Sequence, residues 1–287
     1  MKNIIESKKQ FSEFMDLYIK SDVIILPILK DNKFHSLNNE LCALYVKILG
    51  GCSYILPFNH EDCINLPIML VDKLNVDNKK YTLDKKEFNH IIPMKNVVDV
   101  NLLNYLNKNN QLNFEELKTN SHSFFERRYY RFSNVNKIIP ITKHMEYCEG
   151  VADNLEKVIG SYKQDDVLDV YNNIVLDNLG YIESSGLSID TDIASDELKK
   201  HLSKKGKIFT QYNIYSMTGR PSNRFGGINF AALNKNDGSR KPIKNGFDNG
   251  FLLEFDYDAY HLRLIADIIG YNFPDVSVHE YLGECYG

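Results

Sequence analysis

The sequence has few cysteines and no long apolar run. Its five cysteines form no CxxC pair, so we expect neither a zinc ribbon nor a disulfide framework, and reduced thiols in a cytoplasmic protein are the simplest interpretation. Charged residues interrupt the apolar stretches, which predicts no transmembrane helix and no membrane partner. The N-terminal residues MKNIIESKKQF lack the apolar region of a signal peptide.

The net charge is small but unevenly distributed. The 287 residues carry a net charge of −4, which by itself does not indicate a nucleic-acid-binding protein. Residues 201–244, however, hold nine Lys and Arg against Asp237 alone, a local charge of +8. Such asymmetry favours a polyanionic partner, and a solvated basic face explains it equally well. The nine cations are Lys204, Lys205, Lys207, Arg220, Arg224, Lys235, Arg240, Lys241 and Lys244.

The first residues have the pattern of a helix followed by a sheet. Ser7 and Gln10 form a capping box at the start of a helix. Residues 22–29, DVIILPIL, form a short apolar run that is typical of a buried strand. Residues 40–58 indicate a hairpin that turns at Gly50. Together these features predict a mixed sheet covered by helices.

Further elements follow along the chain. Residues 64–70 are expected to form another strand, and residues 96–106 change towards helical spacing. Thr142 is expected to cap a long helix, and a second long helix should end near Gly186. Between these two helices, residues 164–166 mark the expected domain boundary.

One aromatic run is ambiguous. Residues 123–132, SFFERRYYRF, interleave aromatic side chains with three arginines, which could stack on or grip nucleic acid. A packed strand or helix with exposed arginines is the more common arrangement of such a run. Both interpretations stay open at this point.

Two neighbouring segments carry most of the polar chemistry. Residues 208–243 are rich in glycine, arginine and short polar side chains, which suit contacts with phosphate and sugar. An apolar, strand-like run over residues 251–255 then delivers Asp256 and Asp258 to one place. Carboxylates at a strand end can bind Mg²⁺ together with phosphate oxygens. From these few residues alone, an Asp258 helix cap with an exposed Asp256 is the simpler interpretation.

The order of the motifs carries more information than each motif alone. The stretches TGRPSN, GGINFAALNK and GSRKPI precede FDYDAYHLRLIADIIG and DVSVHEYLGECYG. This order resembles family A DNA polymerases, the DNA polymerase I group of bacteria and phages. That family has a Thr-Gly-Arg motif, an Asn-containing stretch, an Arg, a strand with Asp-Tyr-Ser-Gln-Ile-Glu-Leu-Arg, and then Asp-Ile-His. The close match covers residues 208–287, roughly a quarter of the chain.

The resemblance implies roles for residues of the second segment. Asp256 matches the first palm aspartate, which holds both catalytic Mg²⁺ ions, and the carbonyl of Tyr257 would add a ligand. His279 matches a histidine that contacts the phosphates of the incoming nucleotide, and His261 lies at a position that crowds the sugar. Arg263 matches a structural ion-pair arginine.

The resemblance also implies contacts with primer–template DNA. Arg220 matches the arginine that touches the primer end in the minor groove, and Thr218 belongs to the same motif. Asn229 lies where the family contacts the minor groove of the duplex. Arg240 would help to hold the duplex.

Several positions depart from the family pattern. Asp258, Ala259, Tyr260 and His261 stand in place of Ser-Gln-Ile-Glu. His261 thus replaces a glutamate that excludes ribonucleotides, and Asp258 adds a charge beside the metal site. Ser277 replaces an aspartate. These changes leave sugar selectivity open.

Larger parts of the family are not found in the sequence. The fingers helix and the His-Asp-Glu palm motif with the second metal aspartate would follow Gly287. The similar string NHED, at residues 59–62, lies in the other half of the chain. Residues 186–210 are too few for the usual helical thumb. We therefore expect the product of a split viral gene or a piece of a longer polymerase.

The first half is expected to be an exonuclease-like domain of RNase H-like fold without activity. Its first strand, VIILPIL at residues 23–29, has no carboxylate where the family has Asp-x-Glu. Asp99 could match the aspartate of the second exonuclease motif. The third motif, Tyr-x-x-x-Asp, would begin at Tyr147, but position 151 is Val and Asp153 is displaced.

The combined expectation is an α/β (α+β) chain. Residues 1–163 form a degenerate exonuclease-like domain, and residues 164–287 form a thumb remnant and part of a polymerase palm. The expected function is template-directed DNA synthesis with Mg²⁺, primer–template DNA and dNTPs, completed by a second polypeptide. A non-catalytic DNA-binding subunit is the alternative. A haloacid dehalogenase-like phosphohydrolase is disfavoured because Tyr260 stands where that family has Thr or Val.

Overall fold

The computed structural model describes residues 3–29, 35, 37, 40–108, 139–163, 166–216, 219–223, 228–234, 236–253 and 255–286. The chain forms two compact units, Met1–Ile243 and Lys244–Gly287, and each is described by itself. In the described part of the chain, no helix has the length and hydropathy needed to cross a bilayer. The aromatic run at residues 123–132 lies outside the described residues.

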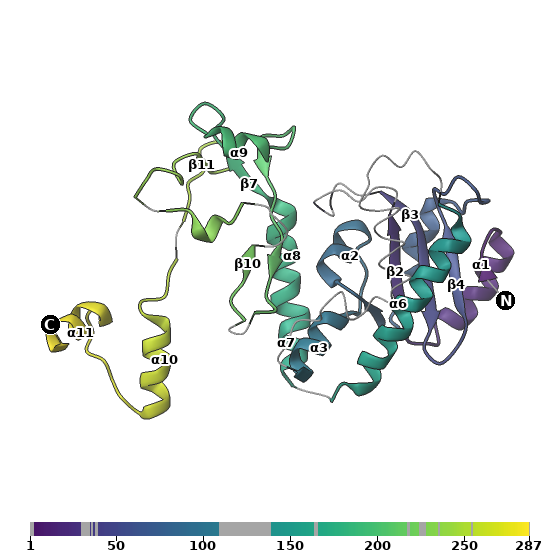
Figure 1. Cartoon of the computed structure of the whole chain (residues 1–287), viewed down its shortest axis with the longest axis horizontal. Helices are drawn as coiled ribbons and strands as arrows, with labels where there is room; N and C mark the ends of the chain where they lie inside the picture. Colours follow the sequence, from purple (N-terminus) through teal and green to yellow (C-terminus); the bar gives the residue numbers. More distant parts are fainter. Residues whose placement is uncertain are drawn as a thin grey trace. The chain divides into compact units, whose positions relative to one another are not determined.

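A six-stranded mixed sheet forms the centre of the first unit (Figure 1). Its strand order is β1-β4-β3-β2-β5-β6. β3 is antiparallel to both β2 and β4, whereas the pairs β1/β4, β2/β5 and β5/β6 are parallel. The strands are β1 (Asn3–Ile4), β2 (Val23–Leu29), β3 (Leu41–Ile48), β4 (Ser53–Pro57), β5 (Lys80–Thr82) and β6 (Val97–Asp99).

The central strand β2 is buried on both faces because helices cover the sheet from two sides. Successive side chains of a strand point to opposite faces. Val23 and Ile25 accordingly pack with Phe14 of helix α1 (Lys8–Tyr18). Ile24, Leu26 and Ile28 belong to a second apolar cluster with helix α6 (Ile141–Ser161), which crosses the sheet in Figure 1. The prediction of a buried strand over residues 22–29 is confirmed.

Two other local predictions are confirmed. The Ser7 hydroxyl accepts the N–H of Gln10 at 3.3 Å, and the Gln10 side chain accepts the N–H of Glu6 at 3.0 Å. These bonds satisfy N–H groups at the start of α1 that have no partner within the helix. β3 and β4 form the expected hairpin, and Gly50 turns the chain with a φ of 69° that suits glycine.

Two local predictions are wrong, and in both cases a proline is involved. Residues 64–70 do not form a strand; Pro67 instead precedes the short 3₁₀ helix η2 (Ile68–Leu74), which buries Leu70, Val71 and Leu74. Thr142 is not the cap of α6, because the helix begins one residue earlier and Pro140 occupies the cap position. Proline suits the start of a helix, where an N–H has no partner.

The second half of this unit begins with an almost continuous helix. α7 (Val167–Val170) leads through a π-helical turn, η3 (Tyr171–Val175), into α8 (Leu176–Ser185), and Gly186 ends the helix with a φ of 64°. The expected end near Gly186 is thus confirmed. The boundary expected at residues 164–166 separates the two domains that the family resemblance implies, whereas the compact units are defined by packing. This boundary stays a prediction.

Short strands and helices complete the chain. α2 (Lys85–Ile91) and α3 (Val100–Lys108) follow β5 and β6, which agrees with the expected change of spacing over residues 96–106. A three-stranded sheet has the order β11-β7-β8. The remaining elements are β7 (Leu187–Ile189), α9 (Asp196–Lys200), β8 (Lys207–Ile208), β9 (Tyr212–Asn213), β10 (Ser222–Asn223), η4 (Phe230–Ala232), β11 (Ile243–Lys244), α10 (Tyr260–Ile269) and α11 (Val278–Tyr286).

A buried ion pair joins α2 to α8. Lys86 Nζ lies 2.6 Å from Glu183 Oε1, and both side chains are almost fully buried. The Lys86 ammonium also donates to the Tyr212 carbonyl at 2.8 Å, and the Tyr212 N–H donates to Glu183 at 2.6 Å. Burial raises the pKa of Glu183, and Lys86 opposes that rise. Each charge therefore depends on the other for its compensation.

A second polar link fixes the π-helical turn to the sheet. The side chain of Asn172 donates to the Val97 carbonyl at 2.9 Å and accepts the Asp99 N–H at 3.0 Å. The Asp99 carboxylate, which has no exposed surface, accepts the N–H groups of Lys85 at 2.8 Å and Leu102 at 3.0 Å. Asp99 thus anchors the first turns of α2 and α3 to the end of β6.

Replacing Lys86 by methionine leaves the Glu183 carboxylate buried without its cation. We expect the free energy of unfolding to fall by about 3–5 kcal/mol, as for other buried pairs that lose one partner. Urea denaturation followed by circular dichroism measures the change. Lys200→Ala is the matched control, because Lys200 pairs with Glu197 on the exposed surface, and it should change stability little. Equal effects of the two substitutions would contradict this assignment.

Stability should also depend on the ionisation of Asp99. Burial raises the pKa of Asp99 to about 7, and the neighbouring Asp84 adds to the rise, whereas an unfolded aspartate has a pKa of about 3.9. Between these values the folded chain binds more protons. The stabilisation by protonated Asp99 is therefore complete below about pH 4 and is lost as the pH rises through 7.

We expect Asp99→Asn to flatten the fall in unfolding free energy between about pH 4 and pH 7, because the amide does not titrate. Urea denaturation at a series of pH values, with the unsubstituted chain beside the variant, measures the difference. Parallel pH profiles for the two proteins would show that Asp99 is ionised throughout this range.

Candidate functional site

The residues that the motifs singled out fall in both compact units. Arg220, Asn229 and Arg240 belong to Met1–Ile243, and the residues from Asp256 to His279 belong to Lys244–Gly287. Thr218 lies outside the described residues. Each group is therefore described within its own unit.

The strand expected over residues 251–255 is not formed in the described residues. Phe251, Leu252, Leu253 and Phe255 lie in coil with their side chains exposed; that of Phe255 is 89% accessible. A strand needs a neighbour that pairs with its N–H and C=O groups. No strand in the described part of the chain pairs with these residues. An apolar sequence run is consequently not enough to make a strand here.

The turn that follows is held by local contacts. Ala259 occupies the cap position of α10 with φ 46° and ψ 45°, a left-handed conformation that is unusual for alanine. Asp258 Oδ2 forms an ion pair with Arg263 at 2.7 Å, and the Arg263 Nε–H donates to the Asp258 carbonyl at 3.0 Å. The Arg263 guanidinium lowers the pKa of Asp258. The interpretation of Asp258 as the helix cap is wrong, because its carboxylate binds the arginine instead.

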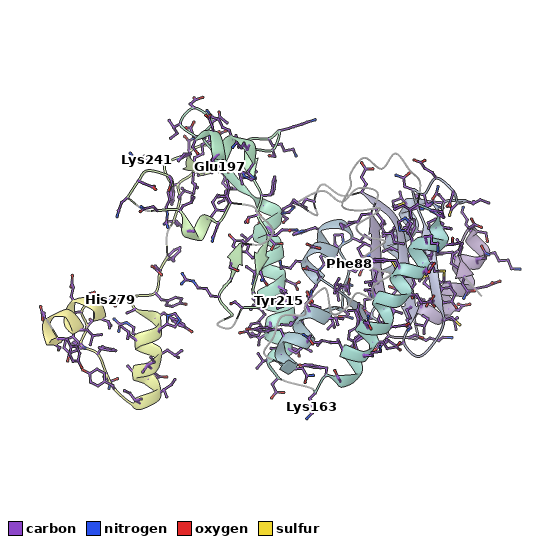
Figure 2. The ribbon with its side chains drawn as sticks, viewed as in Figure 1. Phe88, Lys163, Glu197, Tyr215, Lys241 and His279 are labelled. Atoms are coloured by element: carbon purple, nitrogen blue, oxygen red, sulfur yellow. The ribbon has the colours of Figure 1, made fainter. Side chains whose placement is uncertain are left out.

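The pair brings three of the singled-out positions together. Asp258 Oδ2 also lies 3.5 Å from the N–H of Val278, which opens α11. His279, the next residue of α11 (Figure 2), helps to lower the pKa of Asp258. Asp258 and Arg263 thus connect the start of α10 to the start of α11, and the added charge of Asp258 is compensated by Arg263.

Asp256 and Tyr257 precede this turn in the extended coil, and both side chains are exposed. The ring centroids of Tyr257 and Tyr260 are 5.7 Å apart, and those of Tyr260 and His261 are 5.6 Å apart. Asp256 offers a carboxylate and Tyr257 a carbonyl, which are the hard oxygen donors that Mg²⁺ prefers. These donors fit an ion that takes its remaining ligands from water and substrate phosphates.

The basic segment, residues 201–244, lies on short strands, helices and loops, and all of it except Lys244 belongs to the unit Met1–Ile243. Arg220 is exposed, as are Lys204, Lys205 and Lys241, and Figure 2 labels the last of these. The Nε–H of Arg240 donates to the Leu233 carbonyl at 2.9 Å, so this arginine braces its own loop. Asn229 is exposed and precedes η4. These exposed cations lie where phosphate groups can reach them.

The places where the resemblance would put exonuclease carboxylates are occupied in three different ways. On β2, residues 24, 26 and 28 are apolar and pack against α6. Val151 of α6 belongs to the same apolar cluster, whereas Asp153 binds Lys47 of β3 at 2.6 Å. Both oxygens of Asp99 accept backbone N–H groups. These side chains converge on no common carboxylate site.

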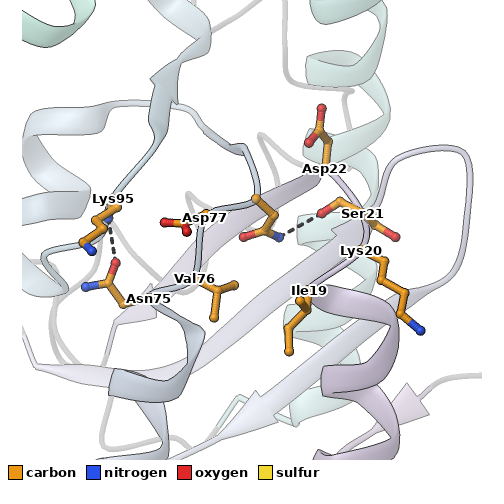
Figure 3. Close-up of a pocket in the computed structure, with 9 residues that line it drawn as sticks. Ile19, Lys20, Ser21, Asp22, Asn75, Val76, Asp77 and Lys95 are labelled. Carbon is orange, nitrogen blue, oxygen red and sulfur yellow. Dashed lines mark hydrogen bonds between the residues drawn. The ribbon is translucent and has the colours of Figure 1, made fainter.

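A separate cavity of about 610 Å³ opens between residues 19–22 and residues 75–78. Lysines and aspartates both line it, and Figure 3 shows Lys20, Asp22, Asp77 and Lys95 around its rim. The Lys95 N–H binds the Asn75 side chain at 2.8 Å across one side. The cavity contains none of the residues that the sequence motifs singled out.

Sequence reasoning missed two polar groups of the first unit. The sequence gives no signal of the Lys86–Glu183 pair, because the two residues are 97 positions apart. Only the fold brings α2 and α8 together. The string NHED at residues 59–62 resembles the palm motif in sequence but gives no signal of a metal site. The structure gathers His60, Asp62 and Cys63 there.

Comparisons with known proteins place the fold. No family model and no curated protein matches the sequence. The POL domain of Pol1 from M. smegmatis, in complex with DNA primer-template and dNTP, is similar over 84% of this chain and 57% of that chain, with a TM-score of 0.56 and 11% identity. The chain thus spans little more than half the length of that polymerase domain.

Two exonuclease structures are more distant. The EXO domain of Aedes aegypti Nibbler has a TM-score of 0.36 and 14% identity, with 61% of this chain and 94% of that chain covered. Escherichia coli RNase D has a TM-score of 0.34 and 7% identity, with 64% and 48% covered. The expected mixed α/β fold class is confirmed, and the chain is similar in fold to a DNA polymerase domain.

Proposed function

We propose that this chain is part of a family A DNA polymerase and takes part in template-directed DNA synthesis. The observation that carries the proposal is the ordered series of motifs from residue 218 to residue 279, placed in a chain whose fold is similar to the Pol1 POL domain. The first half then corresponds to an exonuclease-like domain without its catalytic carboxylates.

In this proposal Asp256 supplies the carboxylate that holds catalytic Mg²⁺. When bound, the ions stabilise the attacking 3′-oxygen and the leaving pyrophosphate. Asp256 and the Tyr257 carbonyl orient the reacting groups, and the exposed side chains of His261 and His279 are available to the incoming dNTP. Arg263 neutralises Asp258, so that the charge of Asp256 remains the main anionic one facing the nucleotide.

The exposed cations supply the contacts with primer–template DNA. Arg220 would touch the primer end in the minor groove, the exposed lysines would bind phosphates, and Arg240 would keep its loop in shape through the Leu233 carbonyl. Such contacts release counterions from the duplex and make affinity fall with salt. Thr218 and Asn229 would add contacts in the minor groove.

The proposed polymerase needs residues that this sequence does not supply. The second metal aspartate and the fingers helix would come from further polymerase sequence, either continuous with this chain or on a second polypeptide. A non-catalytic DNA-binding subunit is the second candidate, and the basic segment 201–244 favours it. The two candidates differ in whether Asp256 matters for synthesis.

The 287-residue chain should bind primer–template DNA with an affinity that falls steeply with salt. Arg220→Ala should weaken binding and reduce the slope of log affinity against log salt by about 1, as expected for one lost cationic contact with the DNA. Fluorescence anisotropy with a labelled primer–template measures both quantities. Lys9→Ala is the control, because Lys9 is an exposed lysine on α1. Equal losses in the two variants would indicate a diffuse charge effect.

Asp256→Asn separates the two candidate functions. With a polypeptide that carries the fingers helix and the second palm motif, the variant should lose primer extension and keep its affinity for primer–template DNA, because an amide is a poor ligand for Mg²⁺. Asp267→Asn, an exposed aspartate on α10 of the same unit, should extend normally. Full extension by the Asp256 variant would leave only the DNA-binding role.

A further inference from the structure

The loop that leaves β4 gathers three metal-ligating side chains that the proposed polymerase role does not use. His60, Asp62 and Cys63 each offer one ligand atom, and these atoms lie within 4.8 Å of one another. His60 Nδ1 is 2.9 Å from Asp62 Oδ1, and Cys63 Sγ is 3.2 Å from the same oxygen. In a tetrahedral zinc site, with bonds of about 2.0–2.3 Å, ligand atoms are about 3.3–3.7 Å apart. Small outward movements would therefore fit an ion between the three side chains.

The hydrogen-bond positions around His60 Nδ1 conflict with each other. The N–H of Asp62 points to Nδ1 at 3.3 Å, which requires a lone pair on that nitrogen. Asp62 Oδ1 lies 2.9 Å from the same nitrogen, which requires a proton between them. His60 is only 4% exposed, so water gives little relief. A cation between Nδ1 and Oδ1 would take the single lone pair of Nδ1 and end its repulsion with Oδ1, and the long contact from the Asp62 N–H would be given up.

The surrounding residues hold these side chains in place before any ion binds. The Asn65 side chain donates to the His60 carbonyl at 2.8 Å and accepts the His60 N–H at 2.8 Å. Asp62 Oδ2 accepts the N–H of Ile141, the first residue of α6, at 3.3 Å. That bond leaves Oδ1 to face the histidine and the thiol. Such outer contacts orient ligands in known metal sites and raise their affinity.

The site has both an entrance and a favourable charge. The Asp62 side chain is 37% exposed and Cys63 is half-buried, so an ion can enter from solvent. Glu6 approaches from the edge of the sheet, where its carboxylate accepts the Ile64 N–H at 3.2 Å. On α6, the ring of His144 stands nearly perpendicular to that of His60, with 5.6 Å between centroids. Carboxylates and imidazoles thus surround the thiol.

We propose that His60, Asp62 and Cys63 bind one divalent transition-metal ion of the zinc type, with solvent as the fourth ligand. The mixed nitrogen, oxygen and sulfur donors suit Zn²⁺ and are poor ligands for Mg²⁺. The ion would tie the loop after β4 to the first turn of α6 through Asp62. This site is separate from the carboxylate at Asp256 and does not depend on the proposed polymerase function.

Titration of the metal-free chain with Co²⁺ tests the site directly. We expect one bound ion per chain, a thiolate-to-cobalt absorption band, and loss of that band when Zn²⁺ is added. Cys63→Ser and His60→Ala should abolish the band, and Asn65→Ala should lower affinity by about 10–100-fold. Cys52→Ser and Cys285→Ser are matched controls, because both thiols are exposed and lie outside the cluster. They should keep the band unchanged.

A second measurement avoids any loss of folding in the variants. In the unsubstituted chain, Zn²⁺ should slow the alkylation of Cys63 and leave that of Cys52 unchanged, as read by peptide mass spectrometry. Equal alkylation of Cys63 with and without Zn²⁺ would overturn the proposal. A cobalt band that persists in Cys63→Ser would also overturn it.

Discussion

The packing of α8 against α2 depends on one buried ion pair. Lys86 and Glu183 are both removed from water, so neither charge is tolerable without the other. Their contact, extended by Tyr212, holds α8 against α2. The position of α8 then sets where Gly186 ends the helix and where the three-stranded sheet begins. The basic residues 201–244 follow α8 in the chain through β8, β9, β10 and β11, so their placement depends in part on a pair of charges in the interior.

The second unit is organised by a different kind of constraint. Its chain direction is set by the left-handed Ala259 and by the contact of Asp258 with Arg263. Apolar side chains such as Phe255, Ile265 and Ile268 stay exposed around this turn. Short-range contacts therefore shape the segment that carries Asp256, whereas burial shapes the first unit. Local chemistry is enough to connect α10 with α11, and it does not create a core.

The sequence predicted the elements whose signals lie in neighbouring residues. It failed where a strand needs a distant strand to pair with. The capping box at Ser7, the strand at residues 22–29 and the hairpin at Gly50 follow from neighbouring residues, and all are present. The run at residues 251–255 has the same apolar character as β2, but no described strand pairs with it. Strand formation depends on such pairing, which a single segment does not reveal.

The candidate sites show the same division. The order of motifs singled out Asp256, Arg263 and His279 as candidates, which stay predictions. It could not reveal that Asp258 takes Arg263 as its partner, since that depends on the turn at Ala259. The sequence alone does not show that His60, Asp62 and Cys63 form a cluster. The cluster depends on the loop after β4 and on the contact of Asp62 with the start of α6. Pairings between distant residues, such as Lys86 with Glu183, required the fold itself.

The apolar face of β2 has a consequence for the evolution of this chain. Ile24, Leu26 and Ile28 share an apolar cluster with Met145 and Val151 of α6. A carboxylate introduced at one of these positions would lose its hydration without gaining a partner. Neighbouring core positions are energetically coupled, so a carboxylate on this strand would be tolerated only with simultaneous changes on the strand and the helix. A metal-binding strand therefore could not arise here by single substitutions without passing through poorly folded intermediates.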